Sequence, residues 1–204
     1  MKTKAKSSYL VINGKRTELT NEQLKQLGIV SETCYLSDDG KIAYIGDYEF
    51  IVIKSDEKLG TTSLLMKECL FEEMNFGGNN DYRKSEIKQF LDKFAIEIAN
   101  IIGEDNLVEH IVDLTADDGL KCYGAIKAKM SLFTANMVRE NVDILDEFKL
   151  DKWWWTCAPY STHKHKNSSW VKCVSPLGDI INYNYFDVSG VRPFCIVKSS
   201  IFVS

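Results

Sequence analysis

The sequence of 204 residues predicts an α+β fold, in which short antiparallel strands carry one or two packed helices. Runs rich in β-branched residues, separated by glycine turns, occupy residues 40–70 and return in the last third of the chain. Between them, an amphipathic pattern with helical spacing follows Ser85. The 45% hydrophobic and 26% charged fractions are ordinary for a globular protein of this length.

The first 35 residues are predicted to form a small leader. Residues 10–19 have the pattern of a hairpin that turns at Asn13-Gly14. Residues 20–23 (Thr-Asn-Glu-Gln) form a capping box, which predicts a short helix ending at Gly28. We therefore divide the chain into a hairpin-and-helix leader, residues 1–35, and a main domain, residues 36–204.

The main domain begins with a predicted meander. Strands are expected at residues 41–45, 49–54 and 61–70, because Gly46-Asp47 and a second turn at residues 57–60 separate the three runs. After a loop rich in glycine and asparagine, Ser85 is a candidate N-cap.

A helix is expected after Ser85, because Ile87, Phe90, Leu91 and Phe94 follow at the spacing of one helical face. We expect this face to pack on the core.

The middle of the chain predicts two more strands and a second helix. Residues 107–114 and 128–133 are expected to be strands, and Thr134 to cap a helix that runs toward Leu145. Asp117-Asp118-Gly119 is a predicted turn. The acidic pair lacks the ligand spacing of a calcium loop, so we do not expect a metal there.

The last third holds all four tryptophans and 10 of the 23 aromatic residues. Strands are expected at residues 153–159, 169–174, 179–183 and 190–197. On a strand, Trp153 and Trp155 share one face and Trp154 takes the other, so at least one tryptophan should be buried.

Exposed Trp and Tyr side chains are typical anchors for sugars and protein partners. We expect Trp155, Trp170 and Tyr183 to be exposed; the alternative is that most of these aromatics pack in the core. The candidate partner-binding residues are Trp155, Tyr160, His163, His165, Trp170, Tyr183 and Tyr185.

The charge is unevenly distributed. Residues 151–204 carry six Lys or Arg against three Asp, a balance of +3, so that −7 falls on residues 1–150 of a chain whose net charge is −4. A net negative chain gives no reason to expect direct nucleic-acid binding. No stretch approaches the roughly 20 apolar residues of a membrane span, and no signal-peptide pattern follows the basic start, so we expect no membrane association.

No catalytic, metal or cofactor pattern is evident. The six cysteines are scattered and are expected to be free and mostly buried thiols. His163-x-His165 could be half of a metal site, but a third ligand is missing and a solvent-exposed loop is expected instead. Cys157 and His163 are near in sequence, yet no nucleophile motif surrounds them. We therefore predict a protein that is not an enzyme and needs no cofactor.

Residues 154–159 (Trp-Trp-Thr-Cys-Ala-Pro) resemble the "WWLRSP" motif of a family of unknown function common in Gram-positive bacteria and their prophages. Residues 85–91 resemble the family's helix, and residues 174–180 and 190–194 (Gly-Val-Arg-Pro-Phe) resemble its closing motifs. The resemblance covers roughly residues 40–200. It implies a C-type-lectin-like domain, as in formylglycine-generating enzymes: a twisted antiparallel sheet, a loop-rich half and a Gly-Val-Arg-Pro strand near the centre.

The resemblance does not imply catalysis, because the enzyme branch needs a copper-binding cysteine pair that this sequence lacks. The chain also departs from the motif at Thr156-Cys157, where the family has Leu-Arg. We expect a non-catalytic binding protein of phage or prophage type, with a protein or glycan partner. An inhibitor of host defence, such as an anti-CRISPR protein in the host cytoplasm, is one form. The alternatives are a virion component, either receptor-binding or structural, and an enzyme with an unrecognised site; the oligomeric state is left open.

Overall fold

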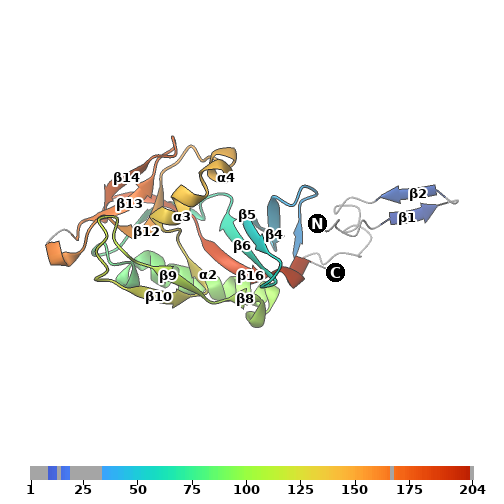
Figure 1. Ribbon diagram of the computed structural model, residues 1–204, viewed down its shortest axis with the longest axis horizontal. Coiled ribbons are helices and arrows are strands. Elements are labelled where there is room, and N and C mark those ends of the chain that lie inside the picture. Colours follow the sequence, from blue (N-terminus) through green and yellow to red (C-terminus); the bar gives the residue numbers. More distant parts are fainter. Residues whose placement is uncertain (1–8, 13–14, 19–33, 166–167, 203–204) are drawn as a thin grey trace.

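The computed structural model describes residues 9–12, 15–18, 34–165 and 168–202. Two curled, mostly antiparallel sheets and a few helices form the body, which confirms the α+β class (Figure 1). In the leader, β1 (Tyr9–Ile12) pairs with β2 (Lys15–Glu18) as the predicted hairpin. The predicted leader helix at residues 20–28 lies outside the described residues.

The larger sheet contains the predicted meander and is antiparallel throughout. β16 has β6 on one side and both β11 and β8 on the other. Gly46, with φ +57°, makes the predicted turn between β4 and β5. In spatial order the strands are β11 (Met130–Ser131), β16 (Phe194–Lys198), β6 (Thr61–Met66), β5 (Tyr48–Asp56), β4 (Ile42–Ile45) and β3 (Cys34–Leu36), with β8 (Leu107–Val108) on β16.

The smaller sheet is built mostly from the tryptophan-rich third. β12 lies in its middle, antiparallel to β13 and parallel to β15. The predicted Gly-Val-Arg-Pro strand is in fact two strands, because the chain leaves the smaller sheet at Arg192 and enters the larger one as β16. The order is β14 (Ile180–Asn184), β13 (Trp170–Val174), β12 (Trp154–Pro159), β15 (Val188–Val191) and β7 (Phe71–Asn75).

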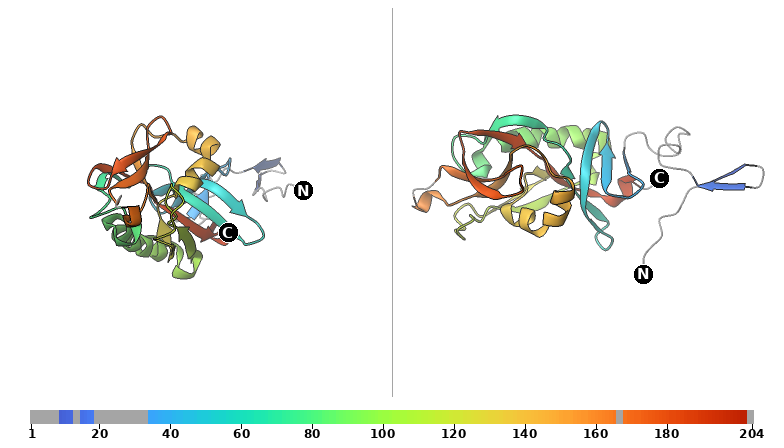
Figure 2. Two further views of the ribbon diagram at one scale, coloured as in Figure 1. Left: turned by 60° about the vertical axis from the view of Figure 1, so that its left-hand side comes forward. Right: turned by 90° about the horizontal axis from the view of Figure 1, so that it is seen from above.

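The main helix, α2 (Glu86–Ile102), forms as predicted: Ser85 Oγ accepts a hydrogen bond from the Lys88 amide at 3.0 Å. Its buried stripe includes Ile87, Leu91 and Phe94. The helix contacts β4, β8 and β11 of the larger sheet and β7 of the smaller one (Figure 2). It therefore closes the core shared by both sheets.

The second predicted helix begins at the Thr134 cap but is broken at Asn141 into α3 (Ala135–Glu140) and α4 (Val142–Glu147). The strand predicted at residues 107–114 is also two strands. β8 pairs with β16, whereas β9 (His110–Asp113) pairs with β10 (Ala125–Ala128), so the chain changes partner at Glu109. Short 3-10 turns complete the body: η1 (Tyr82–Lys84), η2 (Glu104–Asn106), η3 (His163–His165) and η4 (Ser199–Phe202).

The core is divided into two clusters by strand alternation. Trp155 belongs to the main cluster, which α2 covers, whereas Trp154 belongs to a second cluster beside α3. The two tryptophans thus take opposite faces of β12, as the period of two predicts.

Arg192 is buried where the two sheets join. Its Nε donates to Met66 O at 2.8 Å, and its Nη2 donates to Lys67 O at 3.0 Å and to Phe148 O at 3.2 Å. Its guanidinium also lies 5.3 Å from the Trp154 ring centroid. A planar guanidinium can bond several carbonyls at once, so Arg192 joins the crossing to two other segments, residues 66–67 and Phe148.

Candidate functional site

A ladder of aromatic rings leads from the core to the surface of the smaller sheet. Successive ring centroids lie 6.2 Å apart from Tyr82 to Phe76, 5.5 Å from Phe76 to Trp155, 5.6 Å from Trp155 to Tyr183 and 5.7 Å from Tyr183 to Trp153. These spacings are those of interacting aromatic pairs. The outermost ring, Trp153, therefore stacks on the half-buried Tyr183, which itself packs on the fully buried Trp155.

The expectation that Trp155 is exposed is wrong. The residue is fully buried, and its indole Nε1 donates to Met74 O at 2.8 Å. Every residue of β12 is buried, because β13 and β15 flank the strand and core clusters cover both of its faces. Trp155 thus supports the surface aromatics from beneath.

The outer end of the ladder forms an aromatic surface, which we define as Trp153, Tyr183, Tyr185 and Phe186. Trp153 is 36% exposed and stacks on Tyr183 with 11° between the ring planes; Phe186 is 59% exposed and contacts Tyr185 edge-on. The two tyrosines are half-buried against the main cluster. Two of the predicted partner-binding residues, Tyr183 and Tyr185, are therefore brought together here.

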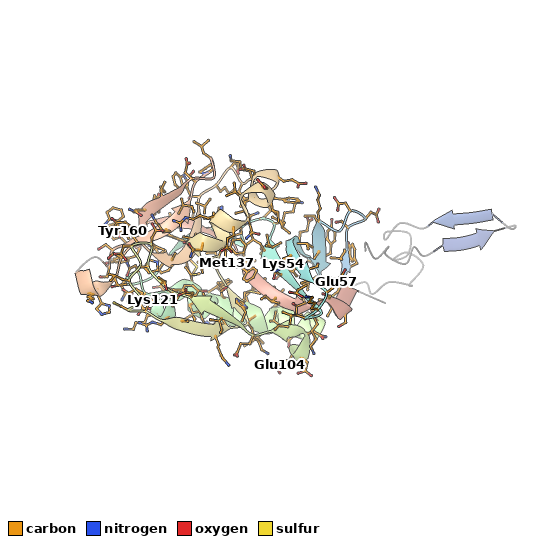
Figure 3. All side chains as sticks on the ribbon, viewed as in Figure 1. Lys54, Glu57, Glu104, Lys121, Met137 and Tyr160 are labelled. Carbon is orange, nitrogen blue, oxygen red and sulfur yellow. The ribbon has the colours of Figure 1, made fainter. Side chains whose placement is uncertain are left out.

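Trp170 and Tyr160 lie apart from the aromatic surface, beside a buried lysine. Trp170 is 40% exposed and shares its face of β13 with Lys172, because side chains two residues apart on a strand point the same way. Lys172 Nζ lies 2.8 Å from Asp117 Oδ2, 2.9 Å from Asn182 Oδ1 and 5.4 Å from the Tyr160 ring centroid. Figure 3 shows Tyr160 at the end of the body formed by the smaller sheet.

Asp117 joins two cations in a charge cluster, defined as Asp117, Arg139 and Lys172. Arg139 Nη2 donates to Asp117 Oδ1 at 2.6 Å, while Lys172 occupies the other carboxylate oxygen. Burial of Asp117 opposes its ionisation, but the hydrogen bonds from Arg139 and Lys172 outweigh burial and lower its pKa. The carboxylate is therefore charged and held on both sides.

A polar pocket of about 220 Å³ opens beside this cluster. It lies between the loop that follows β9, the start of α3 and the end of β12. The side chains that define it are those of Asp113, Thr115, Asp117, Thr134, Asn136 and Arg139.

The predicted histidine pair lies on the η3 turn. His163 is exposed, and its ring stacks on Tyr123 at 5.6 Å. The side chain of His165 is outside the described part of the structure. Over the described residues, no group of three or more His, Cys, Asp or Glu side chains is arranged to hold a metal ion.

Four of the six cysteines are buried, as expected: Cys34, Cys157, Cys173 and Cys195. Burial raises the pKa of Cys157 well above its ordinary value, and it raises those of Cys173 and Cys195 to about 12. A thiol with a raised pKa holds almost no thiolate near neutral pH. Because Cys157 is buried and His163 is exposed, the two do not form a nucleophile–base pair.

No local sequence pattern predicts the polar pocket, because its side chains come from separate segments of the chain. The pattern around Asp117 predicts a turn and no partner for its carboxylate. The one available signal was a lysine inside the apolar strand of residues 170–174, since a buried lysine needs a partner.

Comparison with known proteins gave no match to a family model, to a curated protein or to a solved structure. The resemblance to the prophage family and to the C-type-lectin-like fold therefore stays a prediction. Among the helices in the described ranges, none combines the length and the apolar character that crossing a membrane requires.

Proposed function

We propose that this chain is a non-catalytic binding protein whose aromatic surface holds a protein partner. The observation that carries this proposal is the distribution of exposed rings. Among the described residues, the exposed Trp and Phe side chains are Trp153, Trp170 and Phe186; Trp153 and Phe186 belong to the aromatic surface, whereas Trp170 lies apart from it on the same sheet. Large exposed aromatics are the side chains that most often dominate protein interfaces.

The chemistry of this surface favours a protein over a glycan. Phe186 has no hydrogen-bonding group on its side chain, and neither does the neighbouring Val188, which is 43% exposed. A glycan needs hydrogen bonds to its hydroxyl groups, whereas a protein can cover apolar side chains with its own. The ladder beneath Trp153 also fixes that ring before binding, which reduces the entropy lost on association.

The resemblance to prophage proteins gives the proposal a narrower form. The partner would be a host protein, and the chain would inhibit a host defence in the manner of an anti-CRISPR protein. The acidic residues 1–150 would then act mainly on the rate and specificity of encounter. A virion role is the alternative, and it would give a partner of viral rather than host origin.

The test uses a photo-reactive phenylalanine analogue at Phe186 and, as a matched control, at Ile96. Ile96 is 64% exposed on α2, away from the aromatic surface. Each protein is irradiated in a lysate of a Gram-positive host, with and without phage infection. We expect one protein to be captured from position 186 and not from position 96.

The captured protein is then purified, and its dissociation constant is measured with Trp153→Ala, Phe186→Ala and Ile96→Ala. Loss of an interface anchor costs about 2 kcal/mol or more, so the first two should weaken binding roughly 30-fold. Ile96→Ala should leave the dissociation constant unchanged. Equal binding by all three variants would exclude the aromatic surface, and capture of wall polysaccharide alone would replace the protein with a glycan.

A further inference from the structure

The polar pocket has room for a small molecule. Its volume of about 220 Å³ is more than ten times the roughly 15 Å³ that one water molecule requires on the same measure. The cavity beside Arg192, by contrast, measures about 30 Å³ and has room for only one or two waters. The polar pocket is thus large enough for a ligand of several heavy atoms.

One wall of the pocket is formed by the ion-paired charge cluster. Asp117 and Arg139 line it, and the buried Lys172 supports Asp117 from behind. Lys172 is itself held by Asn182. One carboxylate faces two cations in this cluster, so it keeps one net positive charge, and the carboxylate of Asp113 in the same pocket offsets that charge.

The remaining lining offers both donors and acceptors. Among the described residues, Asp113 Oδ1 takes both hydrogen bonds from Thr115, whereas Asp113 Oδ2 takes none. Thr134 Oγ1 accepts from the Met137 amide, so its hydroxyl hydrogen can still be donated. Asn136 Oδ1 accepts from Arg139, and its two amide hydrogens make no such bond in the described structure.

The groups that line the pocket do not suit a metal ion, an anion or an apolar molecule. A metal would need several oxygen ligands, but both carboxylate oxygens of Asp117 already contact cations. Asp113 is then the one carboxylate lining the pocket that has an oxygen without a hydrogen bond among the described residues. An anion would need a free cation, but Arg139 is paired with Asp117 and Asn136. An apolar molecule would leave these polar groups without partners, which is costly.

From these contacts we infer that the polar pocket binds a small neutral ligand rich in hydroxyl groups, of the size of a cyclic polyol or a monosaccharide. A hydroxyl group both donates and accepts. It can therefore accept from Thr134 and Asn136 while it donates to Asp113. The polar pocket is separate from the aromatic surface, so failure of ligand binding here would leave the proposal of a protein partner unaffected, and the reverse also holds.

The experiment uses the full chain labelled with nitrogen-15. Amide spectra are recorded while myo-inositol, D-glucose and N-acetyl-D-glucosamine are each added to roughly 50 mM, above the millimolar dissociation constants of weak ligands. Sodium sulfate and calcium chloride are the charged comparison probes. Asn136→Ala removes donors at an exposed position, Asp113→Ala removes the acceptor, and Asn100→Ala, exposed on α2, is the matched control.

The expected result is a saturable shift of amides in residues 113–119 and 134–139 with at least one neutral probe. Asn136→Ala and Asp113→Ala should each weaken that binding about tenfold or more while the other amide signals stay in place. Asn100→Ala should bind as the unaltered protein does. The inference is overturned if none of the neutral probes gives saturable shifts, or if only sulfate or calcium moves these amides.

Discussion

Replacing Trp155 by alanine should destabilise the fold severely. A buried Trp→Ala change costs about 3–5 kcal/mol in lost burial and cavity formation. Here the change also leaves Met74 O without its donor and removes the ring contacts with Phe76 and Tyr183. We therefore expect a loss near the upper end, about 5 kcal/mol, out of a total stability of roughly 5–15 kcal/mol.

The control is Trp153→Ala, at the outer end of the same ladder. Trp153 is 36% exposed and loses one stacked contact, with Tyr183, so we expect a cost of about 1 kcal/mol. Urea unfolding followed by circular dichroism measures both. With a slope of about 2–3 kcal/mol per molar, the midpoint should fall by about 2 M for Trp155→Ala and by less than about 0.5 M for Trp153→Ala.

Two results would refute this reasoning. One is a Trp155→Ala midpoint within about 0.5 M of the unaltered protein, since a ring so placed cannot then be part of the core. The other is an equal loss of stability in both variants, because replacing the ring nearer the surface should destabilise the protein less than replacing the buried ring. A change in slope would instead show that the mutation altered the unfolded or native ensemble.

Three further predictions concern buried charges and thiols. Arg192→Lys should destabilise by about 2–4 kcal/mol in the same urea assay, because an ammonium cannot reproduce the bonds to three carbonyls; an unchanged midpoint would contradict this. Asp117→Asn should cost about 3 kcal/mol at pH 7, because Lys172 stays buried without a carboxylate. The lowered pKa of Asp117 makes its contribution fully present above its unfolded value of 3.8 and lost as the pH falls through the lower folded value, so the gap between the two proteins should close in acid and not in base. In alkylation at neutral pH, the exposed Cys122 should react first and Cys157 only after unfolding; a Cys122→Ser protein that keeps the fast phase would contradict this.

Local patterns in the sequence predicted much of the fold. The Ser85 cap, the apolar spacing after it and the glycine turn at Gly46 each depend on neighbouring residues, and each is present in the structure. The predicted strand boundaries are wrong where pairing between residues far apart in the sequence determines the structure. The strand over residues 107–114 divides because its two halves have different partners, β16 and β10, which no local pattern reveals.

The candidate sites were predicted less well, for a related reason. Tryptophan content marks a large apolar area, but the burial of each ring depends on what covers the sheet. β12 is covered on both faces, so Trp155 is interior, whereas Trp153, just before the strand, reaches solvent. The polar pocket depends on contacts among distant segments, such as Asp117 with Lys172, and had no sequence pattern of its own.

The structure explains Thr156 and Cys157, the two residues at which the sequence differs from the motif that it was predicted to resemble. Thr156 is fully buried, and its hydroxyl donates to Lys172 O at 2.8 Å; Cys157 is equally buried, and its amide donates to Phe133 O. Neither side chain reaches either candidate site. Both residues therefore serve core packing, and an arginine side chain at Cys157 would be enclosed in the main cluster. Variants that test binding therefore belong at Phe186 or around the polar pocket, and not at Thr156 or Cys157.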